Sequence, residues 1–166
     1  MSLGVHFALD SATETRVLAL AEAGNDEALL ELLAEIEETW HERRTCHHDK
    51  AWDALHRTLT DGKLEYANGT YPLGAAVLGG RQLIAGEREY TISYLSASQV
   101  RDVTEALDVI EEDWFRQRYF ALGETDYYGP VDEDDLDYTW ADFSDTREFF
   151  ARSAEAGLAV IFTVDA

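Results

Sequence analysis

The chain has little of three things: cysteine, basic residues and long apolar runs. Its 166 residues include one cysteine, Cys46, which cannot form a disulfide within the chain and therefore fits a reducing compartment. No segment approaches the ~18 apolar residues that a membrane-spanning helix needs, and the N-terminus lacks a basic region followed by an apolar one. We therefore expect a cytoplasmic protein that does not bind membranes.

Basic residues are greatly outnumbered by acidic ones. Lysine and arginine total 13 against 34 aspartates and glutamates, so the formal net charge is −21 at pH 7. Such a field repels nucleic acids and anionic membranes, whereas it steers a basic protein towards the chain. The chain is also rich in alanine, and only Lys50 and Lys63 are lysines, so genome-wide composition bias or adaptation to salt is an alternative explanation of the charge. We expect no nucleic-acid partner and consider a basic protein as the partner.

The chain has enough apolar material for a folded domain. Hydrophobic residues make up 46% and aromatic residues 11% of the sequence, which excludes a disordered chain. Val5, Phe7 and Leu9 fall on one side of an alternating pattern, as in a strand with one buried face. Strands are predicted near 4–9, 88–95 and 158–164, the latter two from their β-branched, aromatic and apolar content.

Helices are predicted between these strands. Asn25 is a typical N-cap, and the acids after it, with Arg43 and Arg44 at the other end of the segment, match the dipole of one helix. The predicted helices cover about 11–23, 25–44, 49–60, 96–122 with a break near Asp113, and 142–156. Because helices and strands do not alternate regularly, we predict the α+β class: a single domain over 1–166 with a small β-sheet packed against several α-helices.

The segment TCHHDKAWDALHRTL, residues 45–59, concentrates groups that bind metals. Cys46, His47 and His48 are contiguous, however, and neighbouring side chains on a helix point about 100° apart, so they do not converge on one ion. The preceding HERRT has Thr45 where the zinc-hydrolase motif needs its second histidine. We interpret the segment as a helix capped by Asp49, with His47 and His48 exposed at its entrance.

Other reaction motifs are incomplete. There is no G-x-S-x-G elbow for a serine nucleophile, and GAAVLGGR (74–81) has Gly80-Arg81 where a phosphate-binding loop needs Lys followed by Ser or Thr. The calcium-loop-like segment 132–143 has Asp137 instead of the obligatory glycine and ends in Phe143 instead of glutamate. We therefore assign no catalytic residue, no metal site and no cofactor.

An acidic and aromatic stretch spans residues 119–146. It contains no lysine or arginine, while nine acids are interleaved with seven aromatic residues. Aromatic anchors within a charged rim are typical of protein interfaces, although aromatic residues that fix a solvated loop to the core would give the same pattern. The predicted partner surface consists of Tyr127, Tyr128, Asp132, Asp134, Asp135, Tyr138 and Trp140.

His56 lies beside the apolar stripe of the helix predicted over 49–60. A histidine in this position is commonly a core residue with satisfied ring nitrogens. The alternative is a pocket histidine, and the predicted pocket then comprises Lys50, Trp52, Asp53, His56 and Tyr94.

Several segments resemble one bacterial family. DKAWDALHRTLTDG (49–62), PLGAAVLGG (72–80) and YLSASQVRDVTEAL (94–107) are similar to the YfbM-like proteins, a domain of unknown function, and GVHFALD and GLAVIFTVD fit the same pattern. The resemblance implies a single cytoplasmic α+β domain and no established reaction. It places Asp49, Lys50, Trp52 and His56 in the family motif and leaves Cys46 and His47 outside it.

Two functional hypotheses follow. The first is a non-enzymatic acidic protein-binding module, in a specific version an antagonist or immunity-type protein that covers a basic partner. The alternative is an enzyme or small-ligand-binding protein with its pocket around Trp52 and His56. We favour the first, because no catalytic constellation is complete.

Overall fold

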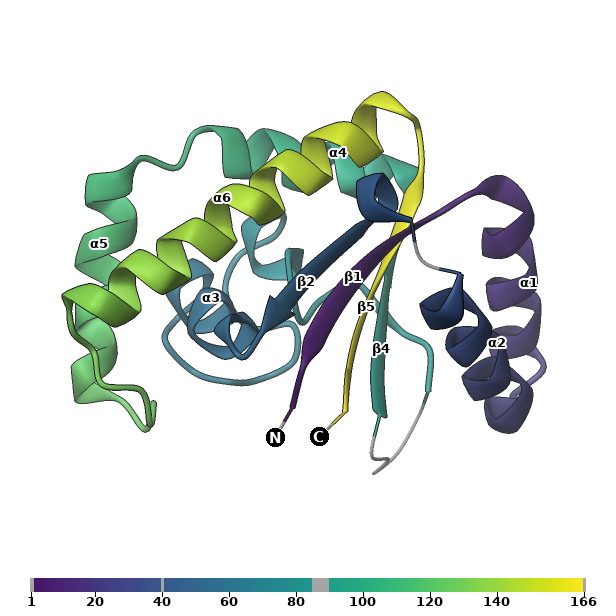
Figure 1. Ribbon diagram of the computed structural model, residues 1–166, viewed down its shortest axis with the longest axis horizontal. Helices are drawn as coiled ribbons and strands as arrows, with labels where there is room; N and C mark the ends of the chain where they lie inside the picture. Colours follow the sequence, from purple (N-terminus) through teal and green to yellow (C-terminus); the bar gives the residue numbers. More distant parts are fainter. Residues whose placement is uncertain (1, 40, 85–89, 166) are drawn as a thin grey trace.

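A five-stranded antiparallel sheet forms the centre of the molecule (Figure 1). The structure, a computed structural model, describes residues 2–39, 41–84 and 90–165. The strands are β1 (Gly4–Leu9), β2 (Thr45–Asp49), β3 (Arg81–Gln82), β4 (Tyr90–Leu95) and β5 (Ala159–Asp165). Their order is β2-β1-β5-β4-β3, so the two ends of the chain pair in the middle of the sheet.

Helices cover both faces of this sheet. One face carries α1 (Ser11–Glu22) and α2 (Asp26–Glu38); the other carries α3 (Ala51–Leu59), α4 (Ala97–Asp108), α5 (Glu112–Phe120) and α6 (Glu133–Glu155) (Figure 1). The alternation of side chains along the strands explains the two layers. On β5, Ile161 packs towards α1 and α2, whereas its neighbours Val160 and Phe162 pack towards α3–α6. The α+β prediction is confirmed.

The predicted strands at 4–9 and 158–164 match β1 and β5. The third predicted strand, 88–95, matches β4 from Tyr90 onwards, and its first two residues lie outside the described residues. None of the described helices is long and apolar enough to cross a membrane.

The predicted second helix is too long. Its Asn25 cap is correct, since the side chain accepts a hydrogen bond from Ala28 N at 3.2 Å, but α2 ends at Glu38. Glu42–Arg44 form a 3₁₀ turn, and Thr45–Asp49 pair with β1 as an edge strand. The strand was missed because its pairing partner is about 40 residues away, so its formation depends on a contact that local periodicity does not record.

The predicted helix 49–60 begins later than expected. Asp49 ends β2 with a positive φ of 51° and does not cap α3, which starts at Ala51. The predicted long helix 96–122 is divided into α4 and α5, with the break at 109–111, close to the expected Asp113. Ser96 begins α4 through a capping box with Gln99.

The last helix is longer than the prediction 142–156. It begins at Glu133, and the Asp132 side chain caps it by accepting a hydrogen bond from Asp135 N at 2.8 Å. Three acids occupy its first turn and Arg152 its last, which matches the helix dipole at both ends. Helix α6 is therefore about 34 Å long and runs obliquely across the side of the molecule that carries α3, α4 and α5 (Figure 1).

Candidate functional site

A cavity of about 530 Å³ lies at the N-terminal end of α6. We call it the aromatic–acidic cleft. It brings together residues of the predicted pocket and residues of the predicted partner surface, two groups that are about 75 positions apart in the chain. Its described lining consists of Ser2, Lys50, Ala51, Trp52, Asp53, Tyr127, Tyr128, Gly129, Asp135, Tyr138 and Thr139.

Hydrogen bonds to carboxylates hold the rings of the cleft. Asp135, in the first turn of α6, accepts hydrogen bonds from the hydroxyls of Tyr119 and, at 3.0 Å, of Tyr127. The Tyr138 hydroxyl donates to Asp49 at 3.4 Å. Burial, followed by the Asp135 carboxylate, raises the pKa of Tyr127, so this phenol stays neutral.

Trp52 forms the inner wall. Its Nε1 donates to the carbonyl of Ser2 at 3.2 Å, and its ring lies across β1 at Gly4. A Cβ at Gly4 would stand 2.8 Å from Trp52 Cγ and 2.9 Å from the ring of Phe162, so the tryptophan can occupy this position because β1 has a glycine there.

The charges of the cleft are mixed. Asp53 accepts a hydrogen bond from Arg57 at 2.6 Å, and the same guanidinium donates to Asp126 at 2.6 Å. Lys50 stands at the lining, and Tyr128 is fully exposed beside it. Phenol rings and carboxylates around an open space are suited to holding a cation, since both attract positive charge.

Not all of the predicted residues meet in the cleft. Tyr94 lies on the opposite face of the sheet, where its hydroxyl donates to Glu14 at 2.5 Å. Trp140 is half-buried against Phe143, with ring centres 5.1 Å apart. Asp132 caps α6 and Asp134 is exposed in its first turn; neither is among the described lining residues.

His56 is 1% exposed and lies in the core beside the cleft, outside its lining. Its Nε2 stands 2.8 Å from the carbonyl of Glu65 and 2.6 Å from the side-chain oxygen of Asn68, while Nδ1 accepts from Leu78 N–H at 3.4 Å. These partners require a hydrogen on Nε2. Burial lowers the pKa of His56, which keeps the ring neutral, so the histidine fastens loop 65–78 to α3.

The sequence analysis missed a buried cluster that contains two histidines and an aspartate. His48, expected to be exposed, is 2% exposed, because it is on the inward face of β2. Its Nδ1 lies 2.9 Å from a carboxylate oxygen of Asp142 on α6, and its Nε2 lies 2.5 Å from Nδ1 of His6 on β1. The other nitrogen of His6 faces the carbonyl of Ala76 at 2.8 Å.

The proton count of this cluster follows from its acceptors. The carbonyl of Ala76 and the carboxylate of Asp142 each need an N–H donor, and the two imidazoles share one more proton between them. Burial lowers the pKa of His48, but the Asp142 carboxylate outweighs it and raises that pKa to about 10. Burial and the neighbouring His48 lower the pKa of His6. The cluster is thus a buried imidazolium–carboxylate pair with a neutral second imidazole.

The side chains of this cluster are buried, so they are not placed to act on a molecule at the protein surface. The cluster lies between β1, β2 and α6, is packed against the rings of Phe149, Phe150 and Phe162, and is not part of the described cavity linings. Among the described residues, no group of three or more His, Cys, Asp or Glu side chains is placed to hold a metal ion.

The fold thus defines an α+β protein with an open antiparallel sheet and a lateral cavity. The chain belongs to the family described as "Domain of unknown function (DUF1877)", whose model matches residues 1–163. It is similar in fold to a protein of unknown function, YfbM from Escherichia coli, with a TM-score of 0.69 and 16% sequence identity over 98% of this chain and 99% of that one. The resemblance to YfbM-like proteins is therefore confirmed. No curated protein matches the chain.

Proposed function

We propose that this protein is a non-enzymatic, acidic binding module that receives a lysine or arginine side chain of a basic protein partner in the aromatic–acidic cleft. One observation carries the proposal: the fold joins rings and carboxylates from residues 50–53 and 127–139 around one open cavity. We further propose a cytoplasmic location, and an antagonist or immunity-type role as the specific version.

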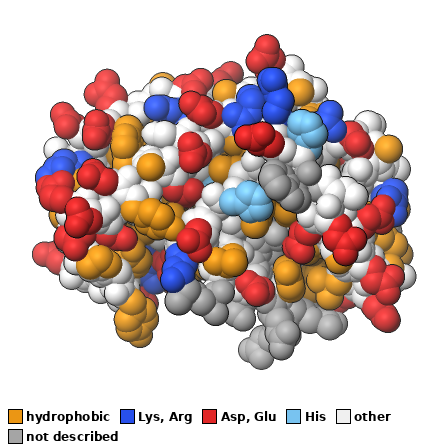
Figure 2. Space-filling view, in the orientation of Figure 1, with side chains coloured by type: hydrophobic (Ala, Val, Ile, Leu, Met, Phe, Trp, Pro, Cys, Tyr) orange, Lys and Arg blue, Asp and Glu red, His pale blue; other side chains and the backbone are white. Residues whose placement is uncertain are grey.

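The overall charge supports a basic partner. At −21, the chain attracts cationic proteins over a distance set by the ionic strength, and this attraction raises association rates more than it raises affinity. In the view of Figure 2, acidic side chains are spread over most of the face, so long-range attraction alone would not select one orientation of the partner.

The cleft supplies the orientation. Tyr127, Tyr138 and Trp52 line the cavity, and a cation over an aromatic face gains about 0.5–2 kcal/mol. The Arg57 guanidinium already lies over the Tyr127 ring, 5.7 Å from its centre. Tyr128 projects fully into solvent next to these residues, and exposed tyrosines at the centre of a patch are frequent energetic anchors of interfaces. The carboxylate of Asp135 completes a cation-binding wall.

The experiment compares capture by matched tyrosine variants. Three proteins are immobilised: wild type, the double variant Tyr128→Ala/Tyr138→Ala, and the control Tyr71→Ala. Tyr71 serves as the control because it is also half-exposed but lies outside the cleft. We expect a basic protein that wild type and the control retain and the double variant loses, with an association rate that falls as salt rises. A set of captured proteins that is the same for all three contradicts the proposal.

A small ligand in the same cleft is the second candidate, favoured by the cavity volume, which lies within the usual 300–1,000 Å³ of ligand sites. This second candidate includes an enzyme whose active site contains Trp52. Lys50→Gln separates the two. Removing this cation strengthens or preserves binding of a basic partner, whereas it weakens binding of an anionic small ligand.

A further inference from the structure

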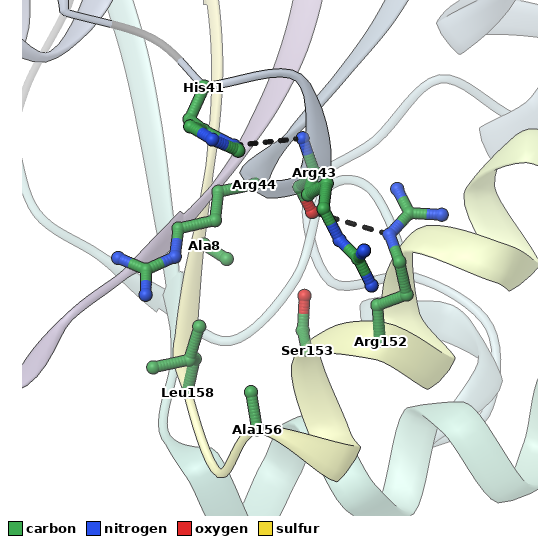
Figure 3. A pocket seen from close by; sticks show the side chains of 8 residues that line it. All are labelled: Ala8, His41, Arg43, Arg44, Arg152, Ser153, Ala156 and Leu158. Atoms are coloured by element: carbon green, nitrogen blue, oxygen red, sulfur yellow. Dashed lines mark hydrogen bonds between the residues drawn. The ribbon is translucent and has the colours of Figure 1, made fainter.

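A second cavity, of about 410 Å³, lies at the C-terminal end of α6 (Figure 3). We call it the arginine cavity. It is formed where the 3₁₀ turn before β2 meets the last turns of α6 and the start of β5. Its described lining consists of Ala8, His41, Arg43, Arg44, Arg152, Ser153, Ala156 and Leu158.

Positive charge is concentrated here in an otherwise acidic protein. Three of the chain's 13 basic residues line this one cavity. Figure 2 shows basic side chains gathered in one group beside a histidine, on a face where they are elsewhere scattered among acids. Within the described part of the chain, Arg43 and Arg152 form no ion pair with a carboxylate, and Arg44 is 3.8 Å from Asp10.

The fold explains only part of this charge. Arg152 is in the last turn of α6, where a cation offsets the helix dipole, and its Nε donates to the carbonyl of Arg43 at 3.3 Å (Figure 3). The amide of Arg43 donates to His41 Nδ1 at 3.2 Å (Figure 3). These contacts fix the backbone of the turn, whereas the guanidinium of Arg43 forms no hydrogen bond or ion pair with another described residue.

An adjoining cavity of about 130 Å³ shares Ala8, His41 and Arg44 with the first. It is also lined by Thr45, which is 7% exposed and whose hydroxyl has no hydrogen-bond partner among the described residues. Buried hydroxyls are nearly always partnered, so an unpaired one in a residue that lines a cavity is available to a water or to a ligand atom. This observation is independent of the arginines.

We infer that the two cavities together bind a small organic phosphate. Guanidinium groups bind phosphate through two parallel hydrogen bonds, which is stronger and more directional than contact with a point charge. Arg43 and Arg152, whose side chains lie on the same side of the cavity, take the phosphate (Figure 3). Arg44 points to the opposite side and also lines the adjoining cavity, where the Thr45 hydroxyl donates to another oxygen of the ligand. The apolar part of the ligand packs on Ala8, Ala156 and Leu158. This site is separate from the cleft at the other end of α6 and does not depend on its function.

The test is calorimetric titration of the full chain with phenyl phosphate, inorganic phosphate and phenol. We expect saturable binding of phenyl phosphate, weaker binding of inorganic phosphate and none of phenol. Arg43→Gln should raise the Kd for phenyl phosphate about tenfold, the effect of one charged hydrogen-bond donor. Arg116→Gln, which removes the same charge on α5, should change it less than twofold.

Thr45→Val tests the hydroxyl without changing the charge, and it replaces an unpaired buried group by an apolar one of the same shape, so the fold should tolerate it. We expect it to raise the Kd at least threefold. Equal Kd values for Arg43→Gln and Arg116→Gln, or no saturable binding by wild type, would overturn the site. Inorganic phosphate binding as tightly as phenyl phosphate would overturn its assignment to an organic ligand, and an unchanged Kd in Thr45→Val would remove Thr45 from it.

Discussion

The two ends of α6 differ in both charge and shape. At the N-terminal end, Asp135 and the tyrosines around it form a cleft suited to a cation. At the C-terminal end, Arg152 lines a cavity together with Arg43 and Arg44 of the 3₁₀ turn before β2, and these charges suit an anion. The helix dipole favours this sequence of charges, acids first and bases last. The comparison teaches that a net charge of −21 conceals an uneven distribution, in which an acidic and a basic cavity lie at opposite ends of one helix about 34 Å long.

Between these ends, α6 is fastened to the sheet by Asp142 and His48. If this contact holds the helix in place, then both cavities depend on it, and disturbing it should change both ends together. Disturbing one end should leave the other unchanged. The predictions below test this arrangement.

The largest effect is expected from Asp142→Asn. It leaves the buried imidazolium of His48 without its counter-charge, and breaking a buried pair in this way costs about 3–5 kcal/mol of the free energy of unfolding. Urea denaturation measures the loss. Asp145→Asn, an exposed site on the same helix, is the control and should change stability by less than about 0.5 kcal/mol. Equal stability of the two variants would show that the contact does not hold α6.

The pH dependence of stability should sharpen the same point. The pKa of His48 rises from 6.5 to about 10 on folding, so its stabilisation is complete below pH 6.5 and is lost as the pH rises through 10. The pKa of His6 is lowered, so its contribution is lost as the pH falls below 6.5. We expect the cluster to stabilise the fold most near pH 6.5.

Denaturation at pH 7 and pH 9 tests this prediction. Above pH 6.5, each pH unit should remove at most about 1.4 kcal/mol of the cluster's contribution. The difference in unfolding free energy between wild type and Asp142→Asn isolates that contribution from other titrating groups. A difference that does not shrink between pH 7 and pH 9 would contradict the protonated His48.

A smaller effect, confined to one end, is expected from Gly4→Ala. The new Cβ would press on Trp52 and Phe162, and such overpacking costs about 1–3 kcal/mol. Because Trp52 forms the wall of the cleft, its fluorescence should shift and capture of the basic partner should weaken, while phenyl phosphate binding at the other end stays unchanged. Weakened binding at both ends would show that the cavities are not independent.

The sequence predicted elements whose signals are local. Asn25 is a cap, and β1 and β5 are strands, because caps and alternation depend on a few neighbouring residues. Strand β2 and the start of α6 were missed. The first is determined by pairing with β1, and the second was interpreted as an acidic loop although Asp132 and the acids after it are a normal helix beginning.

The residues of the candidate sites were predicted in separate groups. Trp52 with Asp53, and Tyr127 with Tyr138, were identified as two separate candidates, and only the fold places them around one cleft. His48 and Asp142 are 94 positions apart, so no spacing rule could pair them. The arginine cavity was missed because Arg43 and Arg44 were interpreted as the end of a helix.

The short strand β3 has a consequence for how copies of the protein meet. It consists of Arg81 and Gln82, both exposed. A strand of another molecule could therefore pair with only two residues along this edge of the sheet. At the opposite border, β2 is brief and its register slips beside Gly4. Both edges of the sheet therefore favour little edge-to-edge pairing between copies of the protein, even at high concentration.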